Sequence, residues 1–204
     1  MHLFERHKPG TVNPSVEDSA SHRLTLDLSR AEALGAMLAH SRASHVVEIS
    51  DLVAGMYLYG WDRLSRYWDQ EDQEKIEALL RRMCRISPER WNYWIQFYDQ
   101  KRRAGAASLN SLPFLRRFRK QSESDLPPRH SAELTAVLKQ AEEIAPFHDI
   151  SNGRRIPILT SECVLLCIVR SRHSEISRRL AASGMKVPHL ERDALSSRRA
   201  PRPD

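Results

Sequence analysis

The sequence predicts an all-α fold made of two pseudo-symmetric four-helix repeats, with an extended helical insertion between them. The segment 159–187, LTSECVLLCIVRSRHSEISRRLAASGMKV, has the pattern of a capped apolar helix, a short polar turn and a second helix that stops at Gly184. A fainter copy of this pattern, VVEISDLVAGMYLYGWDRLSRYW, lies about 110 residues earlier, at 46–68. Strand-like alternation of apolar and polar residues is nowhere sustained. Because a duplicated unit usually packs against its own copy, the pattern indicates a helical recognition module.

The helices of the first half are predicted from apolar stripes and end signals. The stretch 27–40 has capping-box spacing at Ser29 and Glu32, although Gly35 interrupts its stripe. A second helix begins near Ile49, and a third covers 72–86. The three stripes are Ala31, Leu34 and Leu38; Ile49, Leu52, Val53 and Met56; and Ile76, Leu79, Leu80 and Met83.

The central part of the chain begins as a helix and then loses periodicity. Ser87 followed by Pro88 is a good helix start, and an aromatic ridge follows at helical spacing. The ridge consists of Trp91, Trp94, Ile95 and Tyr98. From 106 to 129 the sequence is rich in Ser, Asn and Pro and contains a basic run, so we expect a linker between the halves there.

The second half shows the same succession of helix starts and apolar stripes as the first. Ser131 is a plausible N-cap for a helix with Leu134, Val137, Leu138 and Ala141 on one stripe. We expect a loop over 147–159, with a turn at Asn152-Gly153. After the two helices of the segment 159–187, Pro188 starts a final short helix.

Composition limits the domain organisation and the partners. The chain has 204 residues, enough for one full core or two small halves that share one. Residues 1–25 and 196–204 lack apolar periodicity, so we expect a flexible arm and a disordered tail around a unit spanning 26–195. Within that unit we expect a first repeat at 26–86, an insertion or linker at 87–129 and a second repeat at 130–195.

The charge and the apolar runs limit the location. The net charge of +6 permits nucleic-acid or acidic partners, but the excess is modest. No apolar run approaches the roughly 18–20 residues of a membrane helix, and Met1–Gly10 has no signal-peptide core. We expect a cytoplasmic protein without a membrane partner.

The second half resembles one repeat of the N-terminal domain of Clp-type AAA+ unfoldases. In that resemblance Ser161, Glu162 and Cys163 take the positions of a Thr-Glu-His cap, and Gly184 takes the terminating glycine. In the first half, Ser50 and Asp51 stand at the Glu-His positions. The chain departs from the family in the long segment between the halves and in lacking the family's glycine before each cap. It also has no GxxxxGK[ST] loop.

The resemblance implies protein recognition without ATPase activity. In the family this domain docks adaptors or degradation tags and delivers clients to the attached ring. We therefore expect an adaptor or accessory factor in regulated proteolysis or protein remodelling, or a domain recruited to some other partner after the Clp association was lost. The expected partner is an AAA+ unfoldase or protease, an adaptor or a client peptide.

The resemblance also implies a role for the cap residues. In some relatives the cap glutamate binds the guanidinium of a modified arginine by bidentate hydrogen bonds. Here Glu162 could be such a contact or a simple helix cap, with Ser161 as the capping hydroxyl. Ser50 and Asp51 are the candidate contacts in the first half.

The aromatic ridge has three interpretations. Trp91, Trp94 and Tyr98 could be core residues or a protein-docking face. Together with a nearby basic run they could also bind single-stranded nucleic acid, because bases stack on aromatic rings while cations neutralise phosphates. The cations of that alternative, a nucleic-acid-binding regulator, are Arg116, Arg117, Arg119 and Lys120. We expect a protein partner rather than nucleic acid.

Nothing in the sequence predicts catalysis, a cofactor or a metal site. The nine histidines are scattered and no HExxH spacing occurs. Cys163 and Cys167 lie four apart in an apolar helix, and Cys84 is distant in sequence, so we expect buried free thiols. We predict that the protein is not an enzyme.

Overall fold

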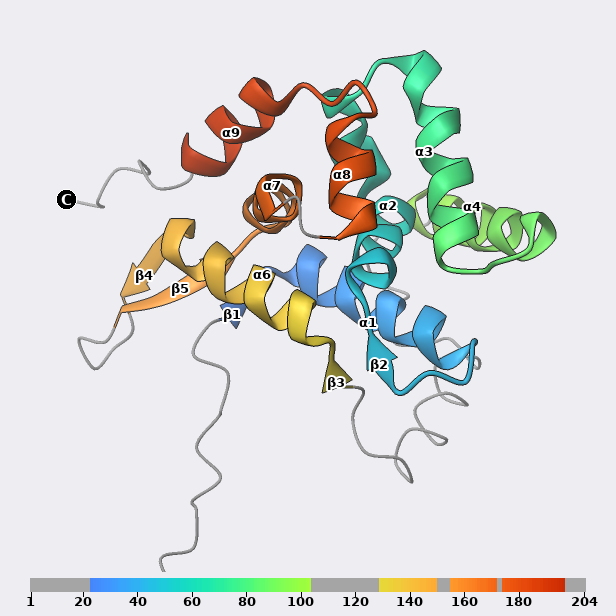
Figure 1. The fold of residues 1–204 in the computed structure, drawn as a ribbon, viewed down its shortest axis with the longest axis horizontal. Coiled ribbons are helices and arrows are strands. Elements are labelled where there is room, and N and C mark those ends of the chain that lie inside the picture. Colours follow the sequence, from blue (N-terminus) through green and yellow to red (C-terminus); the bar gives the residue numbers. More distant parts are fainter. Residues whose placement is uncertain (1–22, 104–128, 150–154, 172–173, 197–204) are drawn as a thin grey trace, which may run out of the picture.

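Most of the described chain is helical, as predicted. The computed structural model describes residues 23–103, 129–149, 155–171 and 174–196, and Figure 1 shows their arrangement. Eight α-helices, one short 3-10 helix and five short strands occur in these ranges. The first half contains β1 (Arg23–Leu24), α1 (Leu26–His40), β2 (Val46–Val47), α2 (Ile49–Leu64), η1 (Ser65–Tyr67), α3 (Gln70–Met83) and α4 (Pro88–Arg103). The second contains β3 (Arg129–His130), α6 (Ala132–Ile144), β4 (Phe147–Asp149), β5 (Arg155–Leu159), α7 (Ser161–Ser171), α8 (Glu175–Ala181) and α9 (Val187–Ser196).

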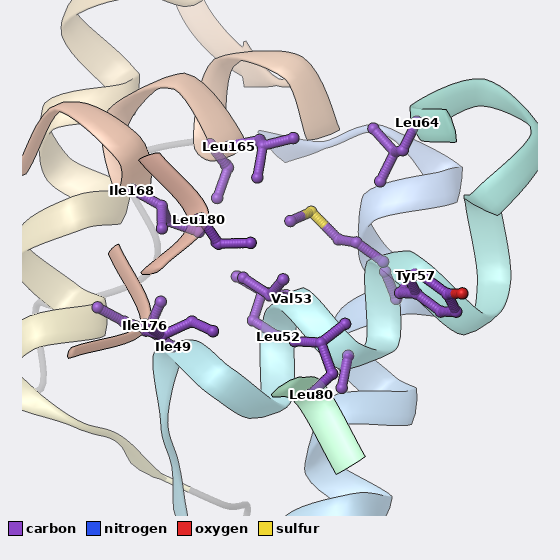
Figure 2. Packing of buried hydrophobic residues seen from close by; sticks show 14 of the residues in the cluster. Ile49, Leu52, Val53, Tyr57, Leu64, Leu80, Leu165, Ile168, Ile176 and Leu180 are labelled. Carbon is purple, nitrogen blue, oxygen red and sulfur yellow. The ribbon is translucent and has the colours of Figure 1, made fainter. Parts of the chain in front are cut away.

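Helices α2 and α7 form the centre of the core. Every residue from Ser161 to Val169 of α7 and from Ile49 to Leu58 of α2 is buried. A helix that is apolar on nearly all sides is stable only when other elements surround it. Accordingly α6, α8 and α9 pack around α7, and α1, α3 and α4 pack around α2. Figure 2 shows side chains of α2 converging with those of α7 and α8.

Two pairs of short parallel strands connect the halves. β1 of the first half pairs with β5 of the second, and β2 pairs with β3. The backbone N–H of Thr25 donates to the carbonyl of Leu159, and that of Ser131 donates to the carbonyl of Val47, both at 2.9 Å. In each pair, the strand before the first helix of one half therefore lies beside the strand before the second helix of the other half.

The expected loop at 147–159 is wrong, because β4 and β5 form an antiparallel hairpin there. Both strands are short, and Pro157 within β5 is a residue that sequence patterns treat as a signal against a strand. The predicted turn at Asn152-Gly153 lies outside the described residues.

Glycines allow the backbones of α1 and α2 to touch. A β-carbon on Gly55 of α2 would lie well inside van der Waals contact with the carbonyl oxygen of Ala31 in α1. On the facing helix, a β-carbon on Gly35 would lie 2.8 Å from the carbonyl oxygen of Asp51. Gly35, which interrupts the predicted stripe of the first helix, is thus a packing residue.

The helix ends correct some predicted caps and confirm others. Helix α1 starts at Leu26 and is capped by Thr25, so the predicted capping box at Ser29 lies inside the helix. Ser131 caps α6 as predicted, accepting from the N–H of Leu134 at 3.1 Å. Gly184 has the left-handed conformation expected of it, with φ of 75°.

In the connection between α3 and α4, a residue other than glycine has the left-handed backbone conformation, which the sequence did not predict. Arg85 has φ of 53°, and the N–H of the following Ile86 donates to the carbonyl of Arg81 at 2.9 Å. This backbone bond closes the end of α3 in the same way that a glycine-terminated helix is usually closed.

Candidate polar site at the start of α7

Glu162 lies where α7 meets the end of α2. Its side chain is only 4% exposed, and its Oε1 accepts from the Nε of Arg63 at 2.7 Å. The same oxygen accepts from a terminal nitrogen of Arg66 at 3.5 Å. Both arginines belong to the first half and are half-exposed. The carboxylate that the resemblance implies is therefore neutralised by the chain itself.

Further charged groups extend this cluster to α1 and α9. Arg63 also contacts Asp27 at 3.3 Å, and Arg66 contacts Asp193 at the same distance. The hydroxyl of Tyr67 donates to Asp193 at 3.0 Å. Burial, opposed by the hydrogen bond from Arg66, raises the pKa of Tyr67 to about 12, so this hydroxyl stays a donor at neutral pH.

The cap of α7 is not the predicted residue. The side chain of Thr160 accepts from the N–H of Cys163 at 3.2 Å, whereas Ser161 is the first residue of the helix. The prediction that Ser161 caps this helix is therefore wrong by one position. Glu162, in the first turn, still lies where a negative charge favours the helix dipole.

Asp51, the candidate contact of the first half, is fully buried and paired. It forms two parallel hydrogen bonds with the guanidinium of Arg42, one of them 2.9 Å between Nη2 and Oδ2. Oδ2 also accepts from the N–H of Glu48 at 3.0 Å, which caps α2. The pKa of Arg42 is raised, chiefly by the bond to Asp51. Ser50 is buried as well, with 3% exposure.

The structure does not bring the two candidate cap sites together. Asp51 lies in the first turn of α2, and Arg63, the partner of Glu162, lies in its last turn. Between them α2 is kinked at Gly60, so the two arginine–carboxylate pairs lie at opposite ends of a bent helix and share no partner among the described contacts. A joint site containing Ser50, Asp51 and Glu162 is therefore not present. Neither Arg42 nor Arg63 was predicted as a partner, since nothing in a single sequence pairs residues 63 and 162.

The aromatic ridge of α4 belongs to the core. Trp91, Trp94 and Tyr98 are 0%, 5% and 8% exposed, which agrees with the core interpretation and leaves these side chains little surface for contact with a partner. Their helical spacing places them on the inward face of α4, where Trp91 packs against Tyr57 with ring centroids 5.6 Å apart. Burial removes these three rings as stacking surfaces for the nucleic-acid alternative, whereas Tyr93 on the same helix is exposed.

Two groups of residues singled out in the sequence remain, the three cysteines and the basic residues of the nucleic-acid alternative. Cys84, Cys163 and Cys167 are buried free thiols, as predicted. Burial raises the pKa of Cys84 to about 12 and that of Cys167 to about 11. The basic candidates Arg116, Arg117, Arg119 and Lys120 lie outside the described residues.

Removing Arg63 is expected to destabilise the protein more than removing an ordinary surface arginine. Among the described contacts, Arg63→Ala leaves the buried carboxylate of Glu162 with the longer one to Arg66. Because Arg63 is itself half-exposed, we expect a loss of about 2 kcal/mol in the free energy of unfolding, below the range for fully buried pairs. Urea unfolding of Arg63→Ala, Glu162→Gln and the double variant measures this. Strictly additive effects would contradict a direct interaction.

The described part of the chain offers neither a membrane-spanning helix nor a metal site. Within these residues, no helix has the length and apolar character needed to span a membrane. In the same ranges, no three His, Cys, Asp or Glu side chains are grouped so that they could bind a metal ion.

Comparisons of the chain with known protein families, curated proteins and solved structures found no related protein. No protein-family profile matches the chain, and neither the curated proteins nor the solved structures contain a significant match.

Proposed function

We propose that the chain is a protein-recognition module of two Clp N-domain-like repeats, acting in the cytoplasm as an adaptor or accessory factor for an AAA+ unfoldase or protease. The observation that carries the proposal is the reciprocal pairing of β1 with β5 and of β2 with β3. Such an exchange is what two copies of one unit produce when they pack about a two-fold axis.

Local features at corresponding positions support the duplication. Thr25 and Ser131 both cap the helix after the exchanged strand, and each donates its N–H across the junction. Arg85 and Gly184 both have positive φ between the third and fourth helices of their halves. On this assignment α4 is the fourth helix of the first repeat, which would then extend to Arg103 rather than end at residue 86 as expected from the sequence.

The carboxylates of Glu162 and Asp51 are already paired with arginines, and this argues against a site for modified arginine. A guanidinium ligand at Glu162 would have to displace Arg63, and one at Asp51 would have to displace Arg42 from a buried bidentate contact. Both sites are already filled by arginines of the same chain. We therefore do not propose an arginine-tag site, and we place partner recognition on the outer helix surfaces.

Affinity capture tests the proposal. The tagged full-length chain is used as bait in lysate of its own cells, and captured proteins are identified by mass spectrometry beside a tag-only control. The proposal predicts that a AAA+ unfoldase, a protease subunit or one of their clients is enriched over the control. If none of these classes is enriched, the adaptor function should be abandoned.

A further inference from the structure

The corner where α3 meets α4 carries an exposed surface that is both basic and aromatic. Arg82 lies in the last turn of α3, Arg85 follows that helix, and Arg90 lies in the first turn of α4; all three are exposed. The stretch 81–97, all of it described, holds four arginines against one glutamate, a net charge of +3. Figure 1 shows this corner at the right-hand edge of the fold, away from α6 and α9. We define the α3–α4 patch as Arg82, Arg85, Arg90, Tyr93 and Phe97.

The exposed arginines of the patch are unpaired. Among the described residues, Arg82, Arg85 and Arg90 form neither an ion pair nor a side-chain hydrogen bond. By contrast, the exposed Arg170 of α7 pairs with Glu191 at 2.6 Å. An unpaired guanidinium keeps all of its donors for a ligand, and it presents them in a planar fork that fits a carboxylate. The patch therefore presents positive charge that the described residues do not neutralise.

The acids next to the patch already have partners within the protein. Glu77, the nearest acid before the patch along α3, accepts from the hydroxyl of Tyr57 at 3.1 Å. Glu89 lies in the first turn of α4, where hydrogen bonds from its own backbone N–H and from Ser87 lower its pKa. Asp51 of α2 is buried near the end of α3, and the bidentate arginine contact described above balances its charge. These carboxylates are therefore committed to donors other than the arginines of the patch.

Tyr93 provides an apolar contact surface beside the cations. Its side chain is 54% exposed, and it is the one exposed aromatic ring in the described part of the chain. The ring lies 6.1 Å from that of Phe97, nearly parallel to it at 23°, and 5.9 Å from that of Trp94. Arg90, Tyr93 and Phe97 are spaced at i, i+3 and i+7, so they share one stripe of α4. Because two neighbouring rings hold Tyr93 in place, little conformational entropy is lost when a partner covers it.

We propose that the α3–α4 patch docks an acidic segment of a partner protein. Carboxylates of the segment pair with Arg82, Arg85 and Arg90, and one of its apolar side chains packs on Tyr93. Arginine and tyrosine are enriched at protein interfaces and lysine is depleted, and the stretch 81–97 contains no lysine. Single-stranded nucleic acid is instead bound by several rings that stack successive bases. The inference rests on the proposed function, since it names the chemistry of the partner that such a recognition module takes.

A labelled acidic peptide tests the inference on the full chain. The probe is a short peptide of glutamates around a central leucine, and a matched probe carries glutamines in place of the glutamates. Fluorescence anisotropy is expected to show binding of the glutamate probe and at least about 10-fold weaker binding of the glutamine probe. The double variant Arg82→Glu/Arg90→Glu should weaken the glutamate probe at least about 10-fold, and Tyr93→Ala at least about 5-fold.

Matched controls separate docking at the patch from general attraction. Lys139→Glu/Arg178→Glu makes the same change in net charge at exposed positions of α6 and α8, and it should alter affinity by less than about 3-fold. Leu26→Ala truncates a side chain that is 64% exposed at the start of α1, and it should alter affinity by less than about 2-fold. Circular dichroism and urea midpoints verify that all four variants are folded.

Four results would overturn the inference. They are no binding of the glutamate probe, equal binding of both probes, equal losses in the control variants, and tighter binding of an oligothymidylate of the same net charge that the Arg82→Glu/Arg90→Glu variant abolishes. The last result would assign the patch to nucleic acid. An unfoldase captured from lysate while the glutamate probe fails to bind would leave the proposed function standing and overturn this inference alone.

Discussion

Replacing Gly55 with alanine is expected to destabilise the protein by about 3 kcal/mol or more, among the largest effects of any single substitution in the chain. The added β-carbon would collide with the backbone carbonyl oxygen of Ala31. Because the β-carbon is fixed to the backbone of α2 and the oxygen to that of α1, the clash can be relieved only by separating the two helices. Separation would open the packing between two of the core helices. Urea denaturation followed by circular dichroism measures the change.

Two other glycines provide graded controls for this substitution. Gly60, on the same helix, has a φ of −122° and nothing within 4 Å of the position that a β-carbon would take, so Gly60→Ala should change stability by less than about 1 kcal/mol. Gly35→Ala places the new carbon 2.8 Å from a carbonyl oxygen and should have an intermediate effect. If Gly55→Ala were no more harmful than Gly60→Ala, the close approach of α1 and α2 would be contradicted.

Arg42→Ala is expected to reduce the free energy of unfolding by about 3 to 5 kcal/mol. The substitution leaves Asp51 fully buried, with the N–H of Glu48 as its remaining hydrogen-bond donor among the contacts described above. A buried carboxylate without a counter-charge is much less stable than the same group in water. Equilibrium unfolding in urea measures the loss, and Arg42→Lys, which restores the charge without the bidentate geometry, should recover only part of it.

An exposed ion pair provides the matched comparison for Arg42. Arg170 and Glu191 also form a guanidinium–carboxylate pair, through one contact at 2.6 Å, but their side chains are 48% and 42% exposed. Arg170→Ala should therefore change stability by less than about 1 kcal/mol. Similar losses for Arg42→Ala and Arg170→Ala would show that burial of Asp51 does not determine the effect.

The helices were predictable because their signals are local. The stripe Ile49, Leu52, Val53 and Met56 is buried throughout, and Ser131 caps its helix, as periodicity and capping rules predict. The strands were not, because β1, β2 and β3 have two residues each and exist only through partners from the other half. Arg85 gave no signal either, since left-handed backbone is normally announced by glycine.

The candidate site was predicted less well than the fold. Helical spacing correctly placed Trp91, Trp94 and Tyr98 on one face, but spacing does not reveal whether that face meets the core or a partner. Glu162 was identified through the resemblance, whereas its environment depends on Arg63, which tertiary structure brings to it.

The exchanged strands have a consequence for how the chain is made. β1 lies at the beginning of the described chain, yet its pairing partner β5 comes just before α7. On a translating ribosome, β1 must therefore wait until most of the chain has been synthesised before it can pair. Contacts between distant parts of a sequence slow folding, because the intervening loop must be closed first. We therefore expect β1 and β2 to remain unpaired during synthesis until the second half supplies β5 and β3.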